Sequence, residues 1–76
     1  MTLADTKIGY TYYVKKITLE RDVTRRLQVI GMTNTTAVTV LNKKRRGALV
    51  LKVRGARFAL GAELTRGIEV GGETYE

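Results

Sequence analysis

Hydrophobic and polar residues alternate along much of the chain, which is the pattern of half-buried β-strands. Residues 10–19 are rich in aromatic and β-branched side chains and are expected to form the first strand, after a lead-in over residues 1–7. The phase of the alternation changes between Val14 and Ile17. This change predicts a bulge or a bend near Lys15–Lys16.

The period changes to that of a helix over residues 22–30. Asp22 is expected to cap the N-terminus, because its carboxylate can accept hydrogen bonds from free backbone amides. Gly31 is expected to end the helix in the left-handed conformation, and Met32 to fold back onto it. A helix this short is unstable alone, so it should be a lid packed on the sheet. The apolar face is expected to consist of Val23, Leu27 and Ile30.

After the helix the period returns to two, and the remaining elements are short. A polar turn over residues 42–47 and a tight turn at Gly55 separate the middle strands. The tail over residues 71–76 is expected to be loose. Further strands are expected at residues 36–41, 49–54, 57–60 and 68–70, with a single helical turn at 61–65.

Together these elements predict a mostly β fold, a small SH3-like, partly open barrel of about five strands with one short helix after the first strand. A chain of 76 residues is expected to form a single domain over residues 1–76, with its core within about residues 3–70. The predicted core side chains are Val14, Ile17, Leu27, Ile30, Val38, Val40, Leu49, Leu51, Phe58, Leu60, Ile68 and Val70.

The composition removes the usual covalent and metal supports of a small domain. The chain has no Cys and no His, so neither a disulfide nor a zinc finger is available. Closure of a small sheet on itself is the remaining way to protect the strand edges. The longest apolar run, Ala48–Leu51, is far too short to span a membrane, and no signal peptide is recognised. A soluble cytoplasmic protein is expected.

The residues that catalysis needs are also missing from the sequence. No His or Cys can serve as base or nucleophile, and the carboxylates are scattered without paired spacing. A barrel of this size is further expected to lack room for a deep cleft of about 300 Å³. We therefore expect a binding module that is not an enzyme.

The net charge of +7 is high for the size and attracts acidic proteins, anionic lipids and nucleic acid without choosing among them. One cationic run, residues 43–46, is either a solvated turn or a contact with an acidic partner. Tyr10, Tyr12 and Tyr13 either pack over a neighbouring strand or stack on nucleic-acid bases. Packing is the favoured interpretation, since no aromatic and basic run typical of RNA-binding sheets is present.

The stretch Arg26-Leu27-Gln28-Val29-Ile30-Gly31-Met32 resembles the helix end of the FeoA family, the small cytosolic component of bacterial ferrous iron uptake. The resemblance extends in order over about residues 3–70. It departs from the family pattern at turns, where Ile8, Asn34–Thr35 and Gly47–Ala48 replace residues that usually include Pro. The matching residues elsewhere are Leu3, Gly9, Val14, Ile17, Val38–Val40, Gly47–Val53, Phe58–Leu60 and Gly67–Val70.

The resemblance implies an SH3-like barrel and a role as accessory partner of FeoB, the membrane Fe(II) transporter with a cytosolic GTP-binding domain. Self-association through open edges is a further expectation. Nucleic acid is not favoured as a partner, and membrane contact is expected only through the transporter. No cofactor, catalytic residue or metal ligand is expected. Fe(II) favours His, carboxylate or thiolate ligands, and the chain has no His, no Cys and no clustered acids. The predicted partner-binding residues are Arg25, Arg26, Lys43, Lys44, Arg45 and Arg46.

Overall fold

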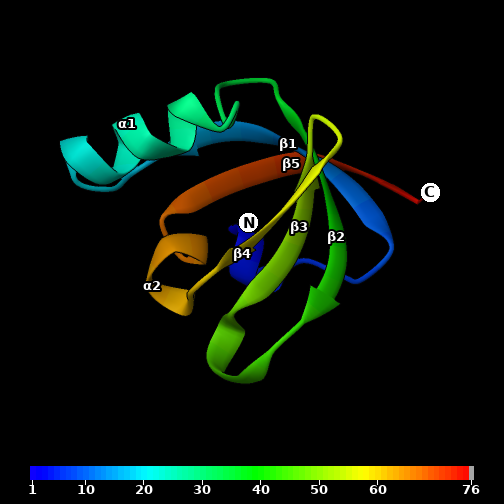
Figure 1. Ribbon diagram of the computed structural model, residues 1–76. Helices are drawn as coiled ribbons and strands as arrows, with labels where there is room; N and C mark the ends of the chain where they lie inside the picture. The colour runs from blue at the N-terminus through cyan, green and yellow to red at the C-terminus, as the bar shows by residue number, and fades with distance from the viewer. Residues whose placement is uncertain (76) are drawn as a thin grey trace.

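The computed structural model describes residues 1–75 and contains five strands, two α-helices and two 3₁₀ turns (Figure 1). The strands are β1 (Tyr10–Ile17), β2 (Ala37–Lys43), β3 (Leu49–Val53), β4 (Ala56–Leu60) and β5 (Ile68–Tyr75). The helices are α1 (Arg21–Val29) and α2 (Ala62–Thr65), and the 3₁₀ turns are η1 (Leu3–Asp5) and η2 (Arg45–Gly47).

The strands form one antiparallel sheet in the order β4-β3-β2-β1-β5. The sheet curls around a single core, and α2 connects its two edge strands (Figure 1). The predicted mostly β, five-stranded arrangement with one helix after the first strand is thereby confirmed.

β1 pairs with both β2 and β5, and its register with β5 is irregular where the sequence changes phase. Val14 pairs with Val70 and Lys16 with Glu69, so one residue of β1 is extra at this point. The bulge predicted near Lys15–Lys16 is therefore confirmed. Its effect is to bend β1 toward α1, as a bulge bends the strand that contains it.

α1 begins one residue earlier than expected, and the prediction that Asp22 caps it was wrong. Glu20 occupies the cap position without a side-chain hydrogen bond, and Asp22 lies inside the first turn. A carboxylate there still interacts favourably with the positive end of the helix dipole. The Thr24 hydroxyl donates to the carbonyl oxygen of Leu19, 3.3 Å away, and so ties the first turn to the preceding loop without capping the helix.

The end of α1 follows the prediction closely. Gly31 has φ +98°, and its amide donates to the carbonyl of Gln28 at 3.0 Å. The amide of Met32 donates to the carbonyl of Leu27 at 2.9 Å. These two bonds form a Schellman motif, which turns the chain back so that Met32 is fully buried.

α1 packs through one narrow face and is not a lid across the sheet. Leu27 is its buried residue, while Val23 and Ile30 are only partly buried. Figure 1 shows α1 at the upper border of the sheet, projecting beyond it. The helix therefore depends on Leu27 for most of its attachment.

Most of the predicted core is confirmed, with nine of the twelve side chains buried. Ile17, Ile30 and Phe58 are corrections, because they lie at the border of the core and are only partly buried. Leu3, Tyr12, Met32 and Val53 are fully buried although the predicted core does not contain them.

The first residues are not a mere lead-in. Leu3 in η1 is fully buried, and the buried hydroxyl of Thr6 donates to its carbonyl oxygen at 2.6 Å. The backbone amide of Thr2 donates to the Asp5 carboxylate at 2.9 Å, which lowers the pKa of Asp5. This segment closes one end of the barrel.

The tail is likewise ordered, so the expectation of a loose segment over residues 71–76 was wrong for its described part. β5 continues to Tyr75, which pairs with Tyr10 of β1, and only residue 76 lies outside the described residues. The apolar alternation stops at Gly71, but side chains of β1 take over the packing there. A Cβ on Gly71 would lie 2.5 Å from the Lys15 side chain, and one on Gly72 would lie 3.0 Å from the Tyr13 ring.

The buried Tyr12 gives a pH-dependent prediction. Its hydroxyl oxygen accepts a hydrogen bond from the amide of Lys7 at 3.0 Å, and burial raises its pKa. Because the raised pKa favours the protonated phenol in the folded state, Tyr12 stabilises the fold below pH about 10 and less so above it. We expect Tyr12→Phe to cost about 1 kcal/mol at pH 7 and to lose less stability than the original chain between pH 9 and 11. Urea unfolding across this range measures both effects, and equal alkaline losses in the two proteins would contradict the prediction.

Candidate functional site

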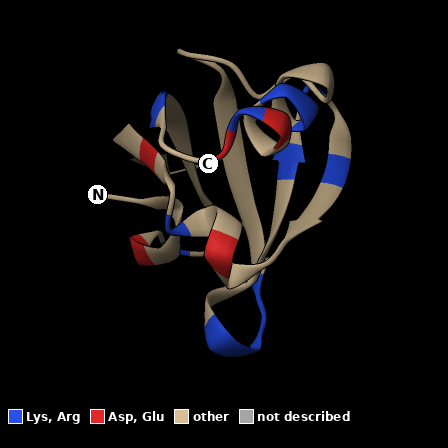
Figure 2. Ribbon diagram, turned by 90° about the vertical axis from the view of Figure 1, so that its left-hand side faces the viewer, with Lys and Arg blue, Asp and Glu red and all other residues tan. Residues whose placement is uncertain are grey.

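Four predicted partner-binding cations form the basic hairpin tip, which we define as Lys43, Lys44, Arg45 and Arg46. The tip is a short 3₁₀ turn closed by a 2.7 Å hydrogen bond from the amide of Lys44 to the carbonyl of Ala48. All four cations are exposed. Figure 2 shows the tip as a continuous basic segment at the bottom of the molecule.

The other two predicted cations, Arg25 and Arg26, are exposed on α1. α1 lies at the top of the molecule and the basic hairpin tip at the bottom in both Figure 1 and Figure 2. The six residues thus form two separate groups, which a partner can contact together only by spanning the length of the domain.

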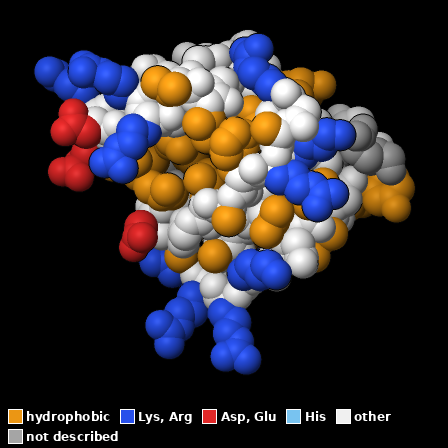
Figure 3. All heavy atoms as spheres, in the orientation of Figure 1, with side chains coloured by type: hydrophobic (Ala, Val, Ile, Leu, Met, Phe, Trp, Pro, Cys, Tyr) orange, Lys and Arg blue, Asp and Glu red, His pale blue; other side chains and the backbone are white. Residues whose placement is uncertain are grey.

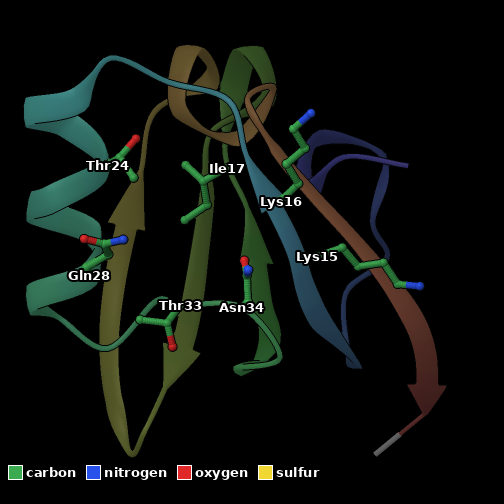
Figure 4. A pocket seen from close by; sticks show the side chains of 7 residues that line it. All are labelled: Lys15, Lys16, Ile17, Thr24, Gln28, Thr33 and Asn34. Carbon is green, nitrogen blue, oxygen red and sulfur yellow. The ribbon is translucent and has the colours of Figure 1, made fainter.

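A feature that sequence reasoning missed is an open hollow of about 460 Å³ between β1, α1 and the loop after α1 (Figure 4). The hollow is wide open to solvent, so it is not the deep cleft that so small a barrel is expected to lack. The bent end of β1 forms one wall, and α1 forms the opposite wall. The lining residues are Lys15, Lys16, Ile17, Thr24, Gln28, Thr33 and Asn34.

The interior of the hollow is polar and uncharged around one apolar side chain. In Figure 4, Ile17 points toward α1 while Lys15 and Lys16 point away from it. The Thr33 hydroxyl is engaged with that of Thr36 at 2.9 Å. Within residues 1–75, no hydrogen bond involves the side-chain amides of Gln28 and Asn34, which leaves both a donor and an acceptor available on each. No hydrophobic or charge pattern in the sequence marks these residues as a site.

An apolar area accompanies the charged surface. Figure 3 shows apolar side chains gathered near the centre of one face, with mostly basic and some acidic side chains around them. The partly buried apolar residues Leu19, Val23, Ile30, Phe58 and Leu64 pack against the core. An apolar area with a polar border is typical of protein contact surfaces.

Of the three tyrosines at the start of β1, Tyr10 and Tyr12 have structural roles, whereas Tyr13 is 43% exposed. Tyr12 is fully buried, and Tyr10 packs edge-on against Tyr75 with ring centroids 5.0 Å apart. The Lys7 ammonium lies 5.4 Å from the centre of the Tyr10 ring. Stacking of bases needs exposed ring faces on neighbouring positions of one strand, which this arrangement does not provide.

The described residues show neither a metal-ligand cluster nor a spanning helix. Across residues 1–75, no three His, Cys, Asp or Glu side chains come together as metal ligands. No helix in this part of the chain has the length and apolar character needed to cross a membrane.

Comparisons with known proteins place this geometry in a family. The family model of the FeoA domain matches residues 1–71. The solution structure of FeoA from Chlorobium tepidum superimposes with a TM-score of 0.86 at 25% identity, covering 93% of this chain and 69% of that one. Among curated proteins, none matches the chain.

Two further structures share the fold. A zinc complex of FeoA from Stenotrophomonas maltophilia, described as an SH3 domain protein, has a TM-score of 0.85 at 23% identity and covers 99% of this chain and 96% of that one. A manganese-dependent transcriptional repressor has a TM-score of 0.85 at 21% identity, with 97% of this chain and only 36% of the repressor covered. The SH3-like architecture predicted from the sequence is thus confirmed, and the match of the family model over residues 1–71 shows that the chain belongs to the FeoA domain family.

Proposed function

We propose that the chain is a non-catalytic accessory or regulator of the FeoB ferrous iron transporter and acts by protein–protein contact in the cytoplasm. Membership of the FeoA family carries this proposal, since that family is associated with ferrous iron transport. The exposed cations of the basic hairpin tip and of α1 supply groups that steer encounter with an acidic surface. Iron itself is handled by the transporter.

Binding to detergent-solubilised FeoB from the same organism tests the proposal. The measurement is made at about 150 mM salt, where exposed charges separated by more than about 8 Å are screened. Saturable binding under this condition supports the proposal. Absence of binding to folded, nucleotide-loaded FeoB contradicts it and leaves the family as a statement of fold.

Charge reversal at the basic hairpin tip should slow this association. We expect Lys44→Glu with Arg45→Glu to lower the association rate constant about tenfold at low salt, because exposed charges mainly set the on-rate. Stopped-flow or surface binding kinetics at two salt concentrations measure the effect, which should shrink at high salt.

The chain offers a matched control for this experiment. Lys52→Glu with Arg57→Glu changes the net charge equally, and the two residues pair with each other across β3 and β4. Arg25→Glu with Arg26→Glu tests the second group of predicted cations. An unchanged on-rate for the hairpin variant at low salt, or an equal loss in the control, would contradict a role for the tip.

A second candidate function is a freestanding module that binds peptides or nucleic acid. The hollow beside β1 favours a peptide, because it offers free amide groups next to a strand. The buried Tyr12 and the packed Tyr10 count against nucleic acid. A steep salt dependence of binding to mixed-sequence RNA would reverse this preference.

A further inference from the structure

The bent end of β1 has one unpaired edge. Pairing of β1 with β2 ends where Val14 and Thr36 meet, with the Val14 amide 3.0 Å from the carbonyl oxygen of Thr36. β1 nevertheless continues to Ile17, where it pairs with Ile68 of β5. Within residues 1–75, nothing pairs with the backbone of residues 15–17 on the side away from β5.

The backbone groups of Ile17 face this free edge. The Thr18 amide donates to the carbonyl of Gly67 at 2.7 Å, so Thr18 directs its groups toward the β5 side. Successive residues of an antiparallel strand direct their amide and carbonyl groups to opposite edges. The amide and carbonyl of Ile17 therefore point toward the hollow, where β2 has already turned away.

The hollow is long enough for a short extended peptide beside the free edge of β1, and it offers suitable hydrogen-bonding groups. The edge over residues 15–17 is ~10 Å long, the length of three extended residues. Gln28 on α1 and Asn34 on the loop after α1 present free side-chain amides, which can bond peptide groups of either polarity. The Ile17 side chain supplies an apolar contact in the interior (Figure 4).

The charges around the hollow indicate what kind of strand fits. Lys15 and Lys16 border the hollow on β1, with their side chains directed away from α1 (Figure 4). Arg21 and Arg25 lie on α1 outside the lining, and the acids Glu20 and Asp22 flank Arg21. Cations therefore outnumber acids around the hollow. A second copy of the chain carries the same net charge of +7 and would be repelled. An acidic segment of another protein is attracted.

We propose that the hollow binds a short extended segment of a partner protein, rich in Asp or Glu, as an added β-strand on the Ile17 edge. The segment exchanges hydrogen bonds with the amide and carbonyl of Ile17, with Gln28 of α1 on its other side and Asn34 of the following loop at one end of the hollow. This inference goes beyond the proposed transporter role and needs only that a partner protein supplies the segment. Its test uses peptides alone, so its failure is distinct from a failure to bind FeoB.

The test is an NMR titration of the full ¹⁵N-labelled chain with three synthetic heptapeptides. The first is acetyl-Asp-Glu-Val-Thr-Val-Asp-Glu-amide, the second replaces its acids with Lys, and the third is the acidic peptide N-methylated at alternate central amides. We expect the acidic peptide to shift the amide signals of Ile17 and Asn34 and to slow hydrogen exchange at Ile17. The Lys peptide and the N-methylated peptide should do neither.

Two variants locate the contact. Asn34→Ala should weaken binding about 3- to 10-fold through one lost hydrogen bond, whereas Asn42→Ala beside the basic hairpin tip should leave it unchanged. Binding of all three peptides alike, shifts confined to the tip, or no shift at millimolar peptide would overturn the proposal. Protection of Ile17 that rises with protein concentration in the absence of peptide would also overturn it, because the occupant would then be a second copy.

Discussion

Replacing Leu27 with Ala is expected to destabilise the fold by about 2–5 kcal/mol, the largest effect of any substitution predicted here. Leu27 is 4% exposed and is the only residue of α1 within the buried core. Its removal leaves a cavity and detaches the helix from the border of the sheet. A domain this small has a total stability of about 5 kcal/mol, so part of the variant should be unfolded at 25 °C. Urea unfolding followed by circular dichroism measures the loss.

Val29 provides the control on the same helix. Its side chain is 82% exposed, so Val29→Ala removes β-branched bulk without opening the core. We expect a change within about 0.5 kcal/mol. A Leu27→Ala protein as stable as Val29→Ala would show that α1 does not attach through the face described above.

Replacing Gly31 with Ala is expected to cost about 2–3 kcal/mol, the second-largest effect. Its φ of +98° strains any residue with a Cβ. An added Cβ would also lie 2.4 Å from the Arg54 side chain, whose Nε donates to the Gly31 carbonyl at 3.2 Å. The substitution therefore adds a steric overlap to the backbone strain and weakens the bond that ties the β3–β4 turn to the helix end.

Gly55 separates these two contributions. It has φ +83° but no atom within 4 Å of an added Cβ, so Gly55→Ala reports the backbone strain alone, about 1–2 kcal/mol. The difference between the two variants should shrink when Arg54 is also Ala. Equal losses at Gly31 and Gly55 would mean that Arg54 moves aside without cost.

Local patterns predicted the parts of the fold that local physics determines. The left-handed end of α1 at Gly31 and the bulge before Ile17 could both be predicted from the sequence, since each depends on neighbouring residues. The burial of Leu3 and the place of Tyr75 in a strand could not be predicted from the sequence, because both come from contacts with residues far away in the chain. Tyr75 is held by Tyr10, and the Met1 carbonyl accepts a 2.9 Å hydrogen bond from the amide of Val70.

The same limit applies to the candidate site. The position of residues 43–46 at an exposed turn followed from the sequence, but their separation from Arg25 did not, because the direction of α1 relative to the sheet is a tertiary property. The hollow was missed for a similar reason. It exists because the segment that leads into β2 stops pairing with β1 at Thr36. No residue type between Ile17 and Asn34 indicates in the sequence where that pairing ends.

The pairing of β1 with β5 also determines how the domain reaches its native state. The first and last strands are neighbours, from Ile17 with Ile68 to Tyr10 with Tyr75, so the central contacts join residues about as far apart in sequence as this chain permits. Such high contact order slows folding to the millisecond-to-second range, because a long loop must close before the contacts form. During synthesis, β1 has its full partner only once the last strand has emerged. Until then its tyrosines and its edge are open to other chains, which makes this the stage at which the protein is most prone to aggregate.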